Sequence, residues 1–171
     1  MSVGGRRIGI ERAPEAVVAL RVVSSLAWLQ SALVGKDAKL APSFLNGAGL
    51  AERAGGAFSH TAIAPWVVTF LHDVVVPHAQ VFALLVAFGD LAIGISLALG
   101  LFARAGAAGE IARCAVNVLV AGGAGADTIG FNVMLATAGI ITIATAAGRA
   151  RGLDGVLQRR MPAARALRVL G

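Results

Sequence analysis

Four long apolar stretches dominate this 171-residue sequence and decide what it can fold into. They cover residues 15–35, 78–103, 107–123 and 128–148. Each is close to the roughly 20 residues that a helix needs to cross the apolar core of a bilayer. Lipid offers the backbone no hydrogen-bond partners, so such segments cross as helices or closed barrels, and continuous apolarity is unlike the alternation of barrel strands. The sequence therefore predicts an all-α integral membrane protein with a four-helix bundle.

The composition agrees with a chain that is surrounded by lipid. Charged residues make up 14% of the sequence, whereas soluble domains usually carry about 25%. Cys114 is the only cysteine, which excludes an intramolecular disulfide, a Cys-x-x-Cys redox pair and a thiolate zinc cluster. His72 and His78 fall at the rim of a span and His60 in a loop. Because membrane haem usually needs histidines on facing helices, we expect no metal or haem site.

Basic residues indicate which ends of the spans face the cytoplasm. Three arginines precede the first span, Arg104 lies between the second and third, and six arginines follow the fourth, whereas the other loops hold Lys36, Lys39 and Arg53. The excess of basic residues on cytoplasmic loops predicts that both termini lie inside, an N-in and C-in topology. The same grouping at the chain ends differs from a basic stripe, so we expect no nucleic-acid partner.

The chain is expected to form one membrane domain with two basic extensions. Residues 1–14 are predicted to be a cytoplasmic N-terminus, residues 15–148 the four-helix transmembrane domain, and residues 149–171 a basic cytoplasmic tail. A long outer loop, residues 36–77, is too polar and too rich in glycine to span the membrane. Within this loop the apolar residues 62–76 are expected to lie at the interface or against the bundle.

Glycine and alanine residues in the spans are expected where helices approach closely. Gly89 and Gly94 in the second span and Ala136 and Gly139 in the fourth are the candidates, because small residues let neighbouring backbones come together in lipid.

Four ionisable residues occur inside the apolar spans, namely Arg21, Asp90, Glu110 and Arg113. Each costs about 2.5–3.5 kcal/mol on a lipid-facing helix, so we expect them to face inward and to pair. Helical spacing places three of them, Arg21, Glu110 and Arg113, in two polar stripes. One stripe comprises Glu110, Arg113, Cys114 and Asn117, and the other comprises Arg21, Ser24, Ser25, Trp28 and Ser31.

Two interpretations of these polar residues stand side by side. In the structural one, Arg21 reaches the inner surface, Glu110 caps the start of the third span, and the remaining charges lock the bundle. In the functional one, the charges form a proton relay, a quinone headgroup site or a path for a small solute. Trp28 and Asn117 are then the candidate quinone-binding residues, and Trp28 would stack on the ring.

The residues from Gly89 to Gly109 resemble a signature of the DoxX/DoxD membrane proteins. Their sequence, GDLAIGISLALGLFARAGAAG, follows the family order of Gly and an acid, Gly, Leu-x-Leu-Gly-Leu and Arg. The first span, with Leu20-Arg21, Ser24 to Trp28 and Gly35-Lys36, is similar to the family's opening pattern. The long loop with Pro42, Phe44 and Gly47-Ala48-Gly49 is similar to the DoxD branch, the small subunit of thiosulfate:quinone oxidoreductase. The resemblance covers residues 16–148.

This resemblance implies a four-helix bundle in a prokaryotic cytoplasmic (inner) membrane, next to quinone-linked or redox-stress enzymes. It carries Arg21, Asp90 and Arg104 onto the family's polar positions, although Asp90 stands where the family more often has Glu and the spacing at Lys36 is tighter.

The leading hypothesis is a DoxX/DoxD-like subunit that supports quinone-coupled electron transfer, linked to thiosulfate or to redox stress. Its candidate catalytic residues are Asp90, Arg21, Glu110 and Arg113. We expect no intrinsic cofactor, a quinone as ligand, and the bilayer and further subunits as partners. The alternatives are a non-catalytic scaffold or assembly subunit and a pathway for protons or small solutes.

Overall fold

The computed structural model of the chain describes residues 13–35, 38–58, 63–120, 125–145, 147 and 151–160. The secondary structure of this part is helical throughout. Four helices are long: α1 (Ala13–Leu33), α5 (Ala79–Leu99), α6 (Ala103–Val120) and α7 (Gly125–Thr145). The shorter ones are α2 (Pro42–Leu45), α3 (Ala48–Phe58), α4 (Pro65–Phe70), the π-helical turn η1 (Leu71–Val75) and α9 (Leu153–Arg160). The prediction of an all-α chain is confirmed for the described residues.

Three of the described helices are long and apolar enough to cross a membrane. They are Glu15–Leu33, Ala79–Leu99 and Gly125–Thr145, which correspond to the first, second and fourth predicted spans. The third predicted span, 107–123, overlaps α6, which carries Arg104, Glu110 and Arg113 and is not among these helices. The fourth was predicted to reach Gly148, which lies outside the described residues, as do His60, Lys36 and most of the two basic extensions.

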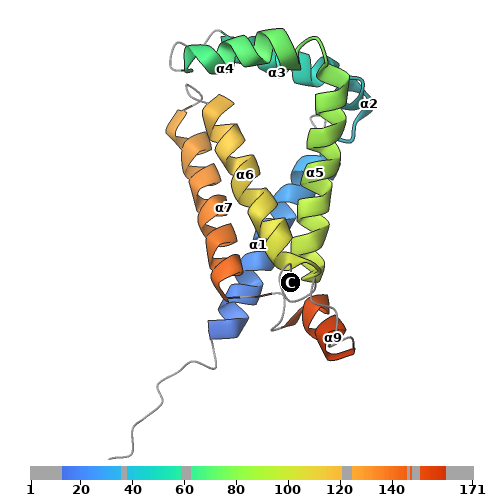
Figure 1. Cartoon of the computed structure of the whole chain (residues 1–171), viewed down its shortest axis with the longest axis vertical. Helices are drawn as coiled ribbons and strands as arrows, with labels where there is room; N and C mark the ends of the chain where they lie inside the picture. The colour runs from blue at the N-terminus through green and yellow to red at the C-terminus, as the bar shows by residue number, and fades with distance from the viewer. Residues whose placement is uncertain are drawn as a thin grey trace, which may run out of the picture.

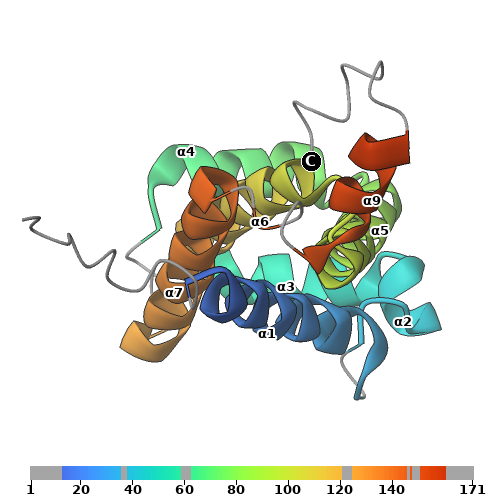
Figure 2. The same cartoon turned by 90° about the horizontal axis from the view of Figure 1, so that it is seen from below.

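The four long helices pack as two pairs. Helix α1 lies along α5 and α6 lies along α7, while contacts between α5 and α6 and between α1 and α7 join the pairs. In Figure 1, α5 and α6 lie close together at the lower end and diverge upward, where α3 and α4 lie across the open end. Figure 2 shows the same helices from below, with α9 at the rim beside α5. The arrangement is narrow at one end and wide at the other.

Glycines set two of the close helix contacts. A Cβ atom at Gly94 would lie 2.8 Å from the Leu29 side chain of α1, and one at Gly139 would lie 3.1 Å from the Ala107 carbonyl of α6. These two predicted contacts are confirmed. The expectation for Gly89 is wrong, because no atom lies within 4 Å of where its Cβ would be. Gly89 instead lines a cavity.

The segment predicted as an outer loop is largely helical where it is described. Pro42 and Pro65 stand in the first turns of α2 and α4, where a missing N–H costs nothing and the fixed φ favours the helix. Val67, Leu71 and Val75 follow at four-residue spacing and pack with Ala57 and Ile63 in one apolar cluster. The predicted apolar piece therefore docks on α3, and Phe82 of α5 and Val120 of α6 pack against the same cluster, in line with the expected placement against the bundle.

The lower end is closed by the chain's C-terminal part. Asp154 of α9 is fully buried, and its carboxylate accepts hydrogen bonds from the backbone N–H groups of Phe102 (2.8 Å) and Ala103 (3.0 Å) at the start of α6. Gly100 ends α5 with φ of +61°, and a Cβ there would lie 2.4 Å from the Arg21 guanidinium. Residues 153–160, predicted as part of a basic tail, thus form a helix that caps α6.

Candidate functional site

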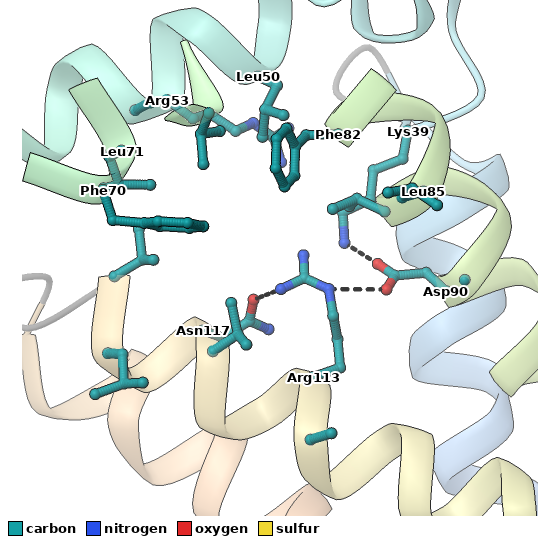
Figure 3. Close-up of a pocket in the computed structure, with 18 of the residues that line it drawn as sticks. Lys39, Leu50, Arg53, Phe70, Leu71, Phe82, Leu85, Asp90, Arg113 and Asn117 are labelled. Carbon is teal, nitrogen blue, oxygen red and sulfur yellow. Dashed lines mark hydrogen bonds and ion pairs between the residues drawn. The ribbon is translucent and has the colours of Figure 1, made fainter. Parts of the chain in front are cut away.

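A cavity of about 780 Å³ lies between α5 and α6, beneath α3, α4 and η1. Its walls are mainly apolar, and Figure 3 shows Leu50, Phe70, Leu71, Phe82 and Leu85 among them. Polar side chains gather at one end, namely Lys39, Asp90, Arg113 and Asn117, with Arg53 of α3 facing them. An apolar pocket with a few convergent polar groups is typical of a small-molecule site.

Asp90 is the centre of the polar end. Its side chain is fully buried, and its two carboxylate oxygens pair with different cations. Oδ2 accepts a hydrogen bond from the Lys39 ammonium, and Oδ1 accepts one from Arg113 Nε at 3.0 Å. Because one carboxylate is shared by two cations, this end of the cavity carries excess positive charge.

Lys39 reaches the cavity because the chain folds back over the end of α1. Its backbone N–H donates to the Ser31 carbonyl at 3.2 Å, and that of Leu40 donates to the Ala32 carbonyl at 3.0 Å. These bonds satisfy the last carbonyls of α1 and direct the lysine inward. Burial lowers the pKa of Lys39, and the neighbouring Asp90 carboxylate opposes part of that change.

Two asparagine side chains on the α7 side of Arg113 fix its orientation through a series of hydrogen bonds. Arg113 Nη1 donates to Asn117 Oδ1, Asn117 Nδ2 donates to Asn132 Oδ1 at 3.0 Å, and Asn132 Nδ2 donates to the Thr128 carbonyl at 2.8 Å. Helix α7, which provides Thr128 and Asn132, contributes no described residue to the cavity wall. Its role here is to support α6.

The predicted aromatic ligand contact lies elsewhere in the structure. Trp28 is buried in an apolar cluster with Ile93, Leu97 and Cys114. Its Nε1 donates to Glu110 Oε1 at 3.0 Å, and neither residue lines the cavity. Among the predicted site residues, the structure therefore brings Asp90, Arg113 and Asn117 together and keeps Trp28 and Glu110 apart from them.

Arg21 belongs to the closed lower end. It is 2% exposed, and its guanidinium donates to the carbonyls of Ala147 (2.9 Å) and Arg151 (3.4 Å). Asp154 supplies the nearby negative charge. Arg104, the other basic position of the family pattern, is the second residue of α6, whereas the sequence placed it between the second and third spans.

Five apolar side chains line the cavity and are also exposed on the outside of the molecule. They are Trp66 (62%), Phe70 (47%), Leu85 (63%), Val116 (49%) and Leu119 (48%). Three of them belong to α5 and α6, so they form a lateral mouth between the diverging helices. On a water-soluble protein, an exposed apolar surface of this kind marks an interaction site. On a membrane protein, it is the ordinary surface that faces lipid.

Of the three histidines the structure describes His72 and His78, and neither lines the cavity. His72 pairs with Asp73 at 2.7 Å, and His78 Nδ1 lies 3.0 Å from the Val74 carbonyl, both on the exposed surface. In the described ranges no group of three or more His, Cys, Asp or Glu residues is placed to hold a metal ion.

A family model described as "TQO small subunit DoxD" matches residues 17–170. The chain belongs to the DoxD family. The match includes all four long helices, the cavity and α9, and it confirms the resemblance seen in residues 16–148. Together with the three long apolar helices it shows a membrane protein of this family. Comparison with curated proteins and with solved structures gives no match.

Missing from the sequence-based site were Lys39 and Asn132. Lys39 lies only six residues after the end of α1. A lysine so close to the end of a span could have been predicted to pair with Asp90, the acidic residue inside the second span. Asn132 joins α7 to α6 through its hydrogen bond with Asn117.

Proposed function

We propose that this DoxD protein is a membrane subunit of a quinone-linked oxidoreductase and that the cavity between α5 and α6 binds the quinone. The observation that carries the proposal is the polarity of the cavity, which is apolar along most of its length and bears Lys39 and Arg113 at one end. A quinone has the same division, with an apolar ring and tail and two carbonyl oxygens that accept hydrogen bonds.

The residues present fit such a ligand. Arg113 and Lys39 offer charged N–H donors to a carbonyl oxygen, which is the stronger class of hydrogen bond. Phe70 and Phe82, which meet edge to face with ring centroids 6.4 Å apart, give aromatic surface on the apolar side. When bound, a quinone supplies electron-accepting chemistry. The electrons are proposed to come from a partner subunit or a soluble reduced compound such as thiosulfate.

We further propose that α6 completes a four-helix membrane domain, residues 15–148, in a prokaryotic cytoplasmic membrane with both termini inside. Although α6 carries several charges, Glu110 is fully buried and the Arg113 side chain is 20% exposed. The cost of charge in lipid is avoided when the charged residues of a helix face protein or a cavity.

The first test is native mass spectrometry of the protein extracted from its own membranes in mild detergent, which detects bound quinone and partner subunits together. We expect a retained quinone in the wild type. Gly89 lines the cavity, and a Cβ atom there would have no atom within 4 Å, so Gly89→Leu should fill part of the cavity and abolish retention. Gly130→Leu is the matched control, because Gly130 lies on the exposed side of α7 and is also free of close contacts.

Loss of quinone in Gly89→Leu with retention in Gly130→Leu would support the site. A wild-type protein that never carries or binds quinone, but that stays in a large assembly, would contradict the proposal and favour the scaffold subunit.

A pathway for protons or small solutes has less support. The apolar cluster of Trp28, Ile93 and Leu97 lies on the helices between the polar end of the cavity and the Arg21 end. Liposomes that contain only this protein are expected to show no proton or solute flux.

A further inference from the structure

The polar end of the cavity has more hydrogen-bond donors than acceptors. An ammonium has three N–H donors and a guanidinium five. Within the described part of the chain, Lys39 uses one on Asp90, and Arg113 uses one on Asp90 and one on Asn117. Both Asp90 oxygens and Asn117 Oδ1 already accept hydrogen bonds from these cations. The donors that remain are the ones able to meet a ligand.

Resting on the proposed function, we infer that this subsite selects the oxidised form of the ligand: it binds the carbonyl oxygen of a quinone and binds the hydroxyl of the corresponding quinol more weakly. A quinone carbonyl only accepts hydrogen bonds. A quinol hydroxyl also donates one, and its proton would face the Lys39 ammonium and the Arg113 guanidinium. A buried donor left without an acceptor loses the free energy of its hydrogen bond to water.

The charge of the subsite acts in the same direction. Lys39 and Arg113 share one carboxylate, which compensates only one of their two positive charges. Excess positive charge stabilises an electron-rich oxygen and disfavours the positive end of an O–H dipole. Asp90 is a positioning residue in this scheme, because each of its two oxygens pairs with one cation and holds it toward the cavity.

The expected consequence is that the substrate form binds and the product form leaves. Reduction takes two electrons from the proposed donor and two protons from water and converts both carbonyls to hydroxyls, so the same subsite binds the ligand more weakly after the reaction. Inhibition by the quinol product is thereby reduced.

The test compares dissociation constants of a short-tailed benzoquinone and of its quinol, kept reduced under argon, for the full chain in lipid nanodiscs. We expect the quinone to bind at least about tenfold more tightly, since one unsatisfied buried donor is worth about that factor. Lys39→Met should reduce the ratio to about threefold or less, and Lys39→Arg should restore it. The infrared carbonyl stretch of bound quinone should move to lower frequency in the wild type and less so in Lys39→Met.

The control is Arg151→Gln, which removes one positive charge at the exposed lower end, where Arg151 pairs with Glu15. Its ratio should equal that of the wild type. If the wild type binds quinol as tightly as quinone, the inference is wrong but the proposed quinone site remains. This comparison needs only the wild type, so it can be made even if Lys39→Met does not fold. Failure of both forms to bind contradicts the proposed function itself.

Discussion

The two ends of the paired helices bury similar charged residues but satisfy them in different ways. At the lower end, Arg21 donates to two backbone carbonyls and Asp154 accepts from two backbone N–H groups. At the upper end, Asp90 pairs with the side chains of Lys39 and Arg113, which keep further donors directed at a cavity. A buried charge that is fixed by backbone supports the fold, whereas one that retains free donors beside a cavity is available to a ligand.

The largest effect is expected at the lower end, from Asp154→Ala. The change leaves the N–H groups of Phe102 and Ala103 without their acceptor and Arg21 without its nearby anion. We expect the free energy of unfolding to fall by about 3 kcal/mol, measured by denaturant unfolding in detergent. Asp127→Ala, at an exposed position in the first turn of α7, should change it by about 0.5 kcal/mol or less. Equal losses in the two variants would contradict the contrast between the ends.

At the upper end, Asp90→Asn should affect ligand binding more than folding. Without the carboxylate, Lys39 and Arg113 are no longer held together, so quinone affinity should fall about tenfold, or about 1.4 kcal/mol. The loss in unfolding free energy should be smaller than in Asp154→Ala, because the cavity lets water reach both cations. Titration of quinone into nanodiscs and unfolding of the same preparations measure the two quantities. Binding lost only in proportion to folded protein would instead assign Asp90 to the structure.

The lateral mouth can be tested with Val116→Trp. A larger side chain there should slow the association of a long-tailed quinone about tenfold and leave a tail-free quinone nearly unaffected. Stopped-flow quenching of the protein's tryptophan fluorescence can follow both. Val133→Trp serves as the control, because Val133 is similarly exposed on α7 (55% against 49%) but does not line the cavity. Equal slowing of both quinones, or no slowing at all, would place the route of access elsewhere.

The smallest effect concerns pH. Burial lowers the pKa of Lys39 below its ordinary value of 10.5, so the folded protein releases this proton at a lower pH than the unfolded chain does. Between the two pKa values the unfolded state holds more protons, and stability should therefore rise with pH relative to Lys39→Met. Quinone affinity should fall a few-fold over the same window, because the ammonium loses its charge. Lys39→Arg should bind quinone with a flat profile, and a decline of the same size in that variant would exclude Lys39 as its cause.

Hydropathy predicted the long helices well, because apolar length is a local property of the sequence. Predicted and observed boundaries differ by a few residues, as for the second span (78–103) and α5 (Ala79–Leu99). The helical nature of residues 42–75 was missed, since short apolar helices that dock on others carry a weak periodic signal.

The site was only partly predictable. Asp90, Arg113 and Asn117 were found because ionisable and polar residues are rare in spans. Lys39 was missed because its position depends on the chain folding back over α1, and hydropathy holds no information on that fold. Trp28 and Asn117 were predicted together as ligand contacts, but Trp28 bonds to Glu110, and neither of these two residues lines the cavity. Glu110 shares a helix face with Asn117, so what separates them is their position along α6, which the helical period does not reveal.

The mouth between α5 and α6 has a consequence for how occupancy is controlled. Its exposed rim residues, such as Leu85 and Leu119, are apolar, so in the proposed membrane setting the ligand arrives from the bilayer and never crosses water. The concentration that sets occupancy is then the mole fraction of ligand in the membrane. Adding plain lipid should empty the cavity even when the total amount of quinone in the sample is unchanged.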